Sequence, residues 1–278
     1  MIKRLFRRIL AEGRLWLPVT KGKIAEDVVI SLTSYPARLK NLHLVIRSLL
    51  HQSIRPKEIV LYLGTDTKET DIPKSLRKLE KYNFSIKTGY PDVKPHKKYL
   101  FAMKEYSKDA IITIDDDILY DKNFVKDLYL CHKKFPKCVC SRRVHCMKKN
   151  EDGTIKPYNQ WEWECTDIKE PSHQLFSTGC GGVLYPANIF PEEAFDIDAI
   201  KTHCFSTDDI WLKFMELKTD TKVVFTDSKI IHPLTVRNTQ GSALMHTNIA
   251  GENRNDINIR AMESFTGINL ADYCSSKD

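Results

Sequence analysis

The sequence predicts an α/β fold: a single domain with a mostly parallel central sheet flanked by helices. A strand–helix–strand unit occupies residues 28–63, and two apolar strands joined by a helix pair in parallel. A further apolar run, 110–114, follows a helical segment at 99–106 and continues the alternation. The chain has no internal repeat and no linker rich in Gly or Ser. We therefore expect one domain over residues 24–278, preceded by a separate segment, 1–23.

Each predicted element follows from its local pattern. Residues 28–32 form a short apolar strand, and residues 39–51 have a helical period with an apolar stripe of Leu42, Val45, Ile46, Leu49 and Leu50. A second apolar strand covers residues 58–63. The pattern then predicts a surface helix over residues 72–82 and a third strand over residues 84–87.

The composition excludes several classes of protein. The 278 residues are 42% hydrophobic and 28% charged, with only 11 Gly and 12 Pro, which excludes a disordered or collagen-like chain. No apolar stretch approaches the ~18 to 20 residues that cross a bilayer. We therefore expect a protein that is soluble or bound at a surface.

The positive charge is concentrated at the N-terminus. Of the net charge of +7, +6 comes from residues 1–23, where Glu12 opposes seven basic residues: Lys3, Arg4, Arg7, Arg8, Arg14, Lys21 and Lys23. A nucleic-acid-binding protein spreads its positive charge over the folded body, so this distribution excludes that class.

An amphipathic helix is predicted in the same segment. Its apolar positions follow the spacing of one helical face: Ile2, Leu5, Phe6, Ile9 and Leu10. Trp16 and Leu17 follow, and Pro18 ends the pattern. The helix either lies on an anionic membrane or docks on the protein with a solvated basic face. The first alternative predicts a peripheral protein on the cytoplasmic face of the cell membrane.

The eight cysteines are expected to be reduced, because the chain is long and its N-terminus lacks the pattern of an export signal. Six residues with soft ligand atoms crowd one region: Cys131, His132, Cys138, Cys140, His145 and Cys146. Their spacing is not the paired C-x₂-C of structural zinc sites. Small buried core residues are therefore the preferred interpretation.

The predicted chemistry begins where the strand at 110–114 ends. Asp115, Asp116 and Asp117 follow it directly, at the carboxyl end of a parallel strand, where α/β folds bind ligands. In an extended chain, Asp115 and Asp117 point to one side and Asp116 to the other. Two converging carboxylates favour a divalent cation such as Mg²⁺ or Mn²⁺, which leaves positions open for phosphate oxygens. The alternative is a solvated acidic turn.

Other residues fit the same hypothesis. Lys97, Lys98 and Arg38 can supply positive charge to a diphosphate, although each can also be an exposed surface charge. Glycines within residues 178–182 let the backbone approach a ligand closely. Thr207 is a candidate N-cap, followed by the acids Asp208 and Asp209, which serve either as helix-dipole partners or as a general base.

Together these stretches resemble the GT-A fold glycosyltransferases, in particular bacterial surface-polysaccharide enzymes related to glycosyltransferase family 2. The matching stretches occur in the family's order: VVISLTSYPAR (28–38), HKKYLFAM (96–103), AIITIDDDILY (110–120), STGCGGVLYP (177–186) and TDDIWLK (207–213). They span most of residues 27–215, whereas the last 60 residues match only loosely.

The resemblance implies roles for individual residues. The pocket for the nucleotide base and ribose would be lined by Thr33, Ser34, Tyr35 and Arg38. The family's D-x-D motif maps onto Asp115, Asp116 and Asp117, the first near the ribose and the last on the metal. Lys97 and Lys98 would lie near the diphosphate. The donor sugar and the acceptor would border Gly181 and Gly182.

The resemblance also implies a catalytic base and a third metal ligand. Asp208 and Asp209 occupy the place of a Glu-Asp pair whose second acid is the base in inverting members, and the choice between them stays open. His232 is the candidate metal ligand beside Asp115 and Asp117, with His246 as its rival.

The expected function is therefore metal-dependent transfer of a sugar from a nucleoside-diphosphate donor, most simply a UDP-sugar, to a hydroxyl of a glycan or lipid-linked acceptor. The resemblance places this reaction in capsule or lipopolysaccharide synthesis, with Mn²⁺ or Mg²⁺ as cofactor. Tyr158, Trp161 and Trp163 are candidates for stacking on an acceptor sugar. The alternatives are a non-catalytic, membrane-peripheral sugar-binding protein and a sugar-nucleotide nucleotidyltransferase. The turn 33–38 contains no glycine, which disfavours the latter.

Overall fold

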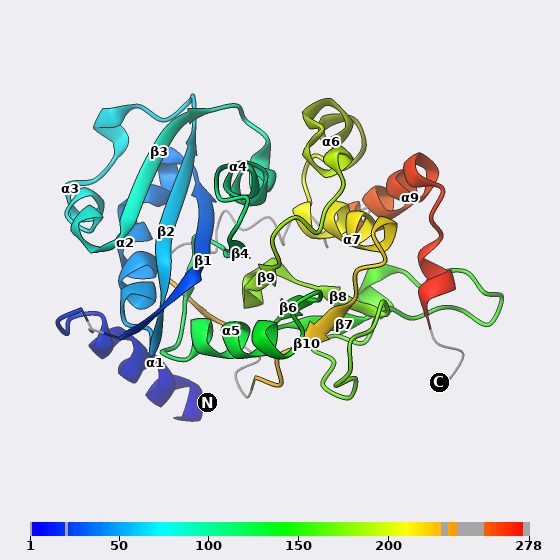
Figure 1. The fold of residues 1–278 in the computed structure, drawn as a ribbon, viewed down its shortest axis with the longest axis horizontal. Coiled ribbons are helices and arrows are strands. Elements are labelled where there is room, and N and C mark those ends of the chain that lie inside the picture. Colours follow the sequence, from blue (N-terminus) through cyan, green and yellow to red (C-terminus); the bar gives the residue numbers. More distant parts are fainter. Residues whose placement is uncertain (1, 20–21, 229–232, 238–252, 275–278) are drawn as a thin grey trace.

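A seven-stranded sheet forms the centre of the molecule (Figure 1). The computed structural model describes residues 2–19, 22–228, 233–237 and 253–274. The strands lie in the order β10-β6-β9-β4-β1-β2-β3, and only β9 runs antiparallel to its two neighbours. The predicted α/β class with a mostly parallel sheet is therefore confirmed, and the arrangement is consistent with a GT-A, Rossmann-like fold.

The first half of the sheet comes from the N-terminal part of the chain. Its strands and intervening helices are β1 (Lys23–Ser34), α2 (Pro36–Leu50), β2 (Ile54–Gly64), α3 (Lys74–Arg77), β3 (Phe84–Tyr90), α4 (Lys97–Glu105) and β4 (Ala110–Thr113). β1 pairs in parallel with both β2 and β4. The predicted strand–helix–strand unit is thus confirmed, with longer strands than the apolar runs alone indicate.

The second half is built from shorter elements. They are β5 (Ile118–Leu119), α5 (Phe124–Lys134), β6 (Val139–Ser141), β7 (Val144–Cys146), β8 (Leu175–Ser177), β9 (Val183–Tyr185), α6 (Ile197–His203), α7 (Asp208–Lys218), β10 (Val223–Phe225), β11 (Leu234–Thr235) and α9 (Arg254–Thr266). Two small antiparallel pairs, β7–β8 and β5–β11, lie outside the main sheet.

Helices cover both faces of the sheet. Ile30 of β1 belongs to a buried cluster with α2 and α5, whereas its neighbour Val29 packs with Ala102 of α4. Successive side chains of a strand thus point to opposite faces of the sheet, as expected from the two-residue repeat of a strand. A second cluster joins α7 and α9 to the β7–β8 pair, and Figure 1 shows these elements on the side away from α1, α2 and α3. None of the described helices is long and apolar enough to span a bilayer.

The predicted surface helix over residues 72–82 is wrong in extent and in exposure. A single helical turn, α3, is followed by a 3₁₀ turn at Glu80–Tyr82, and Asn83 ends it in the left-handed conformation with φ of 56°. Leu76 and Leu79 are buried in a core cluster that includes residues of α2. Most residues of this segment are polar, so the sequence pattern did not show that Leu76 and Leu79 pack against the core.

The N-terminal helix α1 (Ile2–Arg14) is present as predicted, and it contacts the rest of the protein through basic side chains. The guanidinium of Arg8 donates to the carbonyl of Thr235 at 3.0 Å, and that of Arg14 donates to the carbonyl of Tyr120 at 2.6 Å. Phe6 and Ile9 are instead exposed. The docked alternative is therefore wrong about Arg8 and Arg14, because these two basic side chains contact the protein.

Candidate active site

Three carboxylates follow β4 at the carboxyl edge of the sheet, as predicted. The chain does not remain extended through them, because Asp116 and Asp117 lie in a tight turn before β5. The expected alternation of side chains is therefore wrong. Arg38 lies within ion-pair distance of both Asp116 and Asp117, at 2.5 Å and 3.3 Å.

The side chain of Asp116 contacts the end of β1 and the first turn of α2. Its carboxylate accepts hydrogen bonds from the Ser34 hydroxyl at 2.6 Å and from the Arg38 guanidinium. Burial raises the pKa of Asp116, and Arg38 opposes that shift. This contact between β1 and the turn after β4 brings two predicted site segments together, although they are about 80 residues apart in the chain.

The position of Asp117 fits a divalent cation. Burial and then the negative charges of Asp115 and Asp116 raise the pKa of Asp117 to about 6. Carboxylate oxygens are the ligands that Mg²⁺ and Mn²⁺ prefer, and a bound cation would relieve the repulsion between these charges. The proposed third ligand, His232, and its rival, His246, lie outside the described residues.

Lys98 joins the first carboxylate to the acids of α7. Its ammonium group is buried, 3.1 Å from Asp115 Oδ1 and 3.0 Å from Asp208 Oδ2. Burial alone lowers the pKa of an amine, but Asp115, Asp208 and Asp209 together raise the pKa of Lys98 well above its usual value. The site therefore holds a fixed positive charge between the D-x-D motif and α7.

The two lysines of the predicted pair point to different places. Lys97 forms an ion pair with Asp92 at 2.8 Å, next to Gly64 at the end of β2. Of the turn residues, Thr33 donates to the Tyr62 carbonyl, and Tyr35 is exposed beneath the Arg38 guanidinium. All of these side chains lie at the carboxyl ends of the parallel strands, where the sequence places them.

Asp208 and Asp209 have different surroundings at the start of α7. The carboxylate of Asp208 is buried against Lys98, whereas that of Asp209 accepts the Gly179 N–H at 3.1 and 3.2 Å. Burial and then the charge of Asp208 raise the pKa of Asp209, and Lys98 opposes the shift. Thr207 is the N-cap residue as predicted, but its side chain makes no cap hydrogen bond.

The glycine segment passes through this cluster with no space for side chains. A Cβ at Gly179 would lie 3.1 Å from Lys98 Nζ and 3.2 Å from Asp209 Oδ1. At Gly181 it would lie 2.5 Å from Arg143 Cβ. Glycine at these positions therefore allows the backbone to contact the charged groups directly.

Gly182→Ala is expected to lower the free energy of unfolding by about 1–3 kcal/mol more than Gly153→Ala, measured by urea denaturation. Both glycines have φ near +85°, at 84° and 87°. A Cβ at Gly182 would lie 2.3 Å from the Phe124 ring, whereas no atom of the described residues lies within 4 Å of one at Gly153. The pair thus separates overpacking from backbone strain. Equal losses in the two variants would show that Phe124 moves away freely.

Arg143 is a site residue that sequence reasoning missed. Its guanidinium pairs with Glu164 at 3.0 Å and donates to Thr178 Oγ1 at 3.1 Å and to Cys180 Sγ at 3.3 Å. Arg143 therefore holds the glycine segment in place through Thr178 and Cys180. The only signal in the sequence is an Arg-Arg pair after an apolar strand, which is common on protein surfaces.

The three aromatic residues proposed to stack on an acceptor differ in exposure. Tyr158 and Trp161 are buried in the second core cluster, so they are packing residues and that hypothesis is wrong for them. Trp163 is 41% exposed and stacks on His145 with 5.0 Å between ring centroids. Burial lowers the pKa of His145 to about 3, so the imidazole is neutral. Trp163 alone remains a candidate.

All eight cysteines are present as free thiols. Within the described chain, the six residues of the predicted soft cluster do not supply three ligand atoms around one point. The group that does so is Cys146, Glu162 and Cys165, whose ligand atoms lie within 4.8 Å of one another. Burial raises the pKa of Cys146 to about 12, and Glu162 is paired with Lys148. Cys146 is therefore a protonated core residue.

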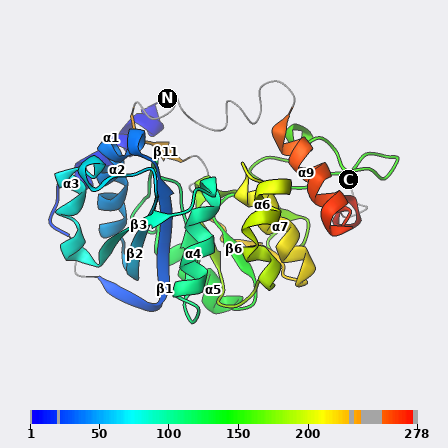
Figure 2. The same cartoon turned by 90° about the horizontal axis from the view of Figure 1, so that it is seen from above.

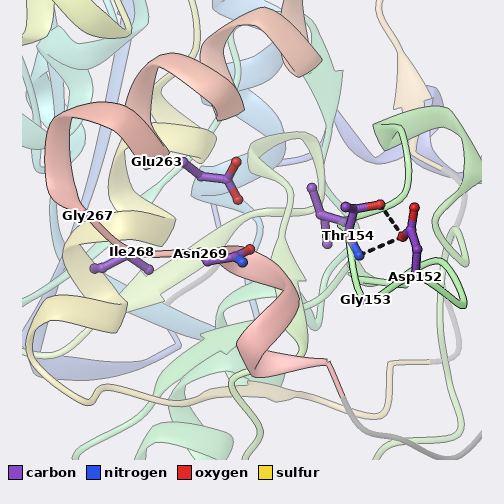
Figure 3. A pocket seen from close by; sticks show the side chains of 8 residues that line it. Asp152, Gly153, Thr154, Glu263, Gly267, Ile268 and Asn269 are labelled. Carbon is purple, nitrogen blue, oxygen red and sulfur yellow. Dashed lines mark hydrogen bonds between the residues drawn. The ribbon is translucent and has the colours of Figure 1, made fainter.

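An open pocket lies elsewhere, between a loop and the end of α9 (Figure 3). It is lined by Asp152, Gly153, Thr154, Ile155, Glu263, Gly267, Ile268 and Asn269. Its acids are already engaged, since Asp152 accepts from Thr154 and Glu263 accepts from the Leu270 N–H. Among the described residues that line the pocket there is no lysine or arginine, whereas Lys98 and Arg38 lie among the carboxylates at β4.

Comparison with known proteins gives similar structures but no family assignment. No protein-family model and no curated protein matches the sequence. Among solved structures, the chain is similar to a mannosyltransferase from Pyrobaculum calidifontis in complex with GDP-mannose and Mn²⁺, with 9% identity and a TM-score of 0.47, covering 88% of this chain and 67% of that one.

Two further structures are similar at comparable levels. A UDP-glucose pyrophosphorylase has 12% identity and a TM-score of 0.40, with 88% of this chain and 98% of that one covered. The bifunctional glycosyltransferase WbbM has 15% identity and a TM-score of 0.42, and the match covers 75% of this chain but only 39% of that protein. Two of these three proteins are glycosyltransferases, and the third is a UDP-glucose pyrophosphorylase. At these scores the similarity assigns neither substrate nor mechanism.

Proposed function

We propose that this protein is a metal-dependent glycosyltransferase that moves a sugar from a nucleoside diphosphate to an acceptor hydroxyl with inversion. The observation that carries the proposal is the convergence of Asp115, Asp117, Lys98 and Asp209 at the carboxyl edge of β4. Buried ionisable groups with raised pKa values are unfavourable for stability, and they are typical of functional sites.

The donor site in this proposal has three parts. Asp115 and Asp117 would hold Mn²⁺ or Mg²⁺, which would supply a Lewis acid for the departing diphosphate. Lys98 adds a fixed positive charge beside Asp115 without reorganisation during the reaction. Arg38 and Ser34 hold the acidic turn through Asp116, and the base and ribose bind beside Tyr35.

The reacting atoms follow from this arrangement. The acceptor oxygen attacks the anomeric carbon, the bond from that carbon to the diphosphate oxygen breaks, and the nucleoside diphosphate leaves with the electron pair. Asp209 takes the acceptor proton, because its pKa is raised and its carboxylate is not ion-paired with Lys98 as that of Asp208 is. Gly181 and Gly182 border the sugar, and Trp163 offers a stacking surface for the acceptor.

The substrate details belong to the proposal as well. The sequence resemblance favours a UDP-sugar and a glycan or lipid-linked acceptor in capsule or lipopolysaccharide synthesis. A nucleotidyltransferase is the second candidate, and it would release pyrophosphate from UTP or GTP and a sugar 1-phosphate. A non-catalytic sugar-binding protein would not require Asp209 with a raised pKa beside the glycine segment.

We expect UDP, GDP or CMP to raise the melting temperature of the wild type only when Mn²⁺ or Mg²⁺ is present, and not to do so in Asp117→Asn. A ligand at a hundredfold excess over its Kd stabilises the folded state by about 2.7 kcal/mol. Asp117 contributes through its side chain, while its backbone contact to Val236 is kept in the variant. Thermal unfolding with each nucleotide and metal measures the effect.

Asp167→Asn is the matched control, because Asp167 is exposed and lies outside the site. It should retain the full shift. A wild type that no nucleotide stabilises under either metal would overturn the donor site. Metal-dependent stabilisation accompanied by pyrophosphate release from a nucleoside triphosphate would favour the nucleotidyltransferase instead.

A further inference from the structure

A stripe of large apolar side chains lies exposed along α1 and the turn that follows it. The exposed fractions are 62% for Phe6, 58% for Ile9, 59% for Leu10, 77% for Trp16 and 57% for Leu17. Phe6, Ile9 and Leu10 have the i, i+3, i+4 spacing of one helical face. Backbone hydrogen bonds from the residues at 15, 16 and 17 continue the helical turn past Arg14. We call these five residues the apolar stripe.

The protein-facing side of α1 carries the polar contacts. Arg8 donates to the Thr235 carbonyl and pairs with Glu12, while Arg14 donates to the Tyr120 carbonyl. Leu15 is only 2% exposed, and its carbonyl accepts from Arg47. A helix on the surface of a soluble protein normally buries its apolar face, so this orientation is reversed. Contacts with the body fix the helix while the apolar stripe faces outward.

We propose that the apolar stripe inserts into the interfacial region of an anionic membrane and docks the protein there. An aromatic and aliphatic face on a positively charged segment is the combination that binds such interfaces. Residues 1–23 contain seven basic residues and one acid, a net charge of +6. A second copy of the chain is a poor occupant, because pairing the stripes would bring two +6 segments together.

Docking at this surface also positions the acidic turn. β11 pairs with β5, which directly follows the three carboxylates, and Figure 2 shows α1 beside β11. Arg8 holds the Thr235 carbonyl, and the next residue, Val236, donates its N–H to the Asp117 carbonyl at 2.7 Å. Two hydrogen bonds thus connect the docked helix to the proposed donor site. The site would then face substrates held at the same membrane, a consequence that rests on the proposed function.

The test is vesicle binding by the full chain. The probes are phosphatidylcholine vesicles with and without phosphatidylglycerol, and bound protein is measured by cosedimentation. We expect the triple variant Ile9→Gln/Leu10→Gln/Trp16→Gln to lower partitioning onto the anionic vesicles at least tenfold. These side chains are exposed, so the melting temperature should not fall. Wild-type binding should weaken as phosphatidylglycerol is removed or salt is added.

Leu130→Gln is the matched control, because Leu130 is a 51% exposed apolar residue on α5. It should bind vesicles like the wild type. Equal vesicle binding by the triple variant and the wild type would overturn the proposal. It would also be overturned if the wild type ignored vesicles and formed a dimer that the triple variant did not. Nucleotide-induced stabilisation tests the donor site separately, so failure of docking and failure of the proposed function are distinguishable.

Discussion

Asp209→Asn is expected to lower sugar transfer by ~10² to 10⁴-fold while donor binding is retained. The amide keeps the volume of the side chain and can still accept the Gly179 N–H, but it cannot take a proton from the acceptor hydroxyl. Steady-state kinetics with the nucleotide sugar identified by thermal unfolding measures the loss. The expected change is in kcat, because the donor and the metal contact other residues.

Two comparisons make this result specific. Asp208→Asn should lower transfer less, because Asp208 acts through its ion pair with Lys98 at 3.0 Å. Because burial raises the pKa of Asp209, the wild-type kcat/KM should rise with pH over a range above the usual carboxyl values, as Asp209 loses its proton. That dependence should be absent from Asp209→Asn. Transfer within about twofold of wild type would remove Asp209 as the base.

The sequence predicts the first half of this fold well because its signals are local. The apolar runs that become β1, β2 and β4 are each continuous, and each ends at a polar turn. Three acids directly after β4 therefore identify the carboxyl edge of the sheet before any tertiary contact is known. The antiparallel strand β9 could not be predicted in this way, because its partners β4 and β6 lie about 70 and 40 residues before it in the chain.

What the sequence could not predict is which polar groups meet. The bond from Ser34 to Asp116 and the support of the glycine segment by Arg143 join residues far apart in the chain. The orientation of α1 is another example. The spacing of its apolar residues predicts a helix. The contacts of Arg8 and Arg14 determine which face of that helix lies against the protein. Periodicity specifies a face, and tertiary partners decide where it points.

A buried ion pair in α7 is a further feature that the sequence conceals. Lys213 and Glu216 are each 1% exposed, with Nζ 3.3 Å from Oε2, and Lys213 also donates to the Leu175 carbonyl of β8 at 2.9 Å. Burial lowers the pKa of Lys213 and raises that of Glu216, and each partner opposes the other's shift. The spacing of three residues looks like an ordinary surface pair in the sequence. Its importance comes from β8 packing over it.

Lys213→Met is therefore expected to lower the free energy of unfolding by about 3–5 kcal/mol at neutral pH, measured by urea denaturation. The variant leaves Glu216 buried without a counter-charge. The raised folded-state pKa of Glu216 sets the sign of the pH dependence. Below the unfolded value of about 4.3 the carboxyl is protonated in both states, and the penalty shrinks. As pH rises through the folded pKa, stability is lost.

Two controls separate the buried charge from the loss of packing. Lys218→Met lies on the same helix but removes a more exposed pair with Glu193, so it should change the free energy of unfolding by only about 0–1 kcal/mol. The double variant Lys213→Met/Glu216→Leu removes both charges and should recover most of the lost stability, because well-packed apolar groups replace buried ion pairs without penalty. A double variant no more stable than Lys213→Met would instead assign the loss to the Leu175 contact and the packing of α7 against β8.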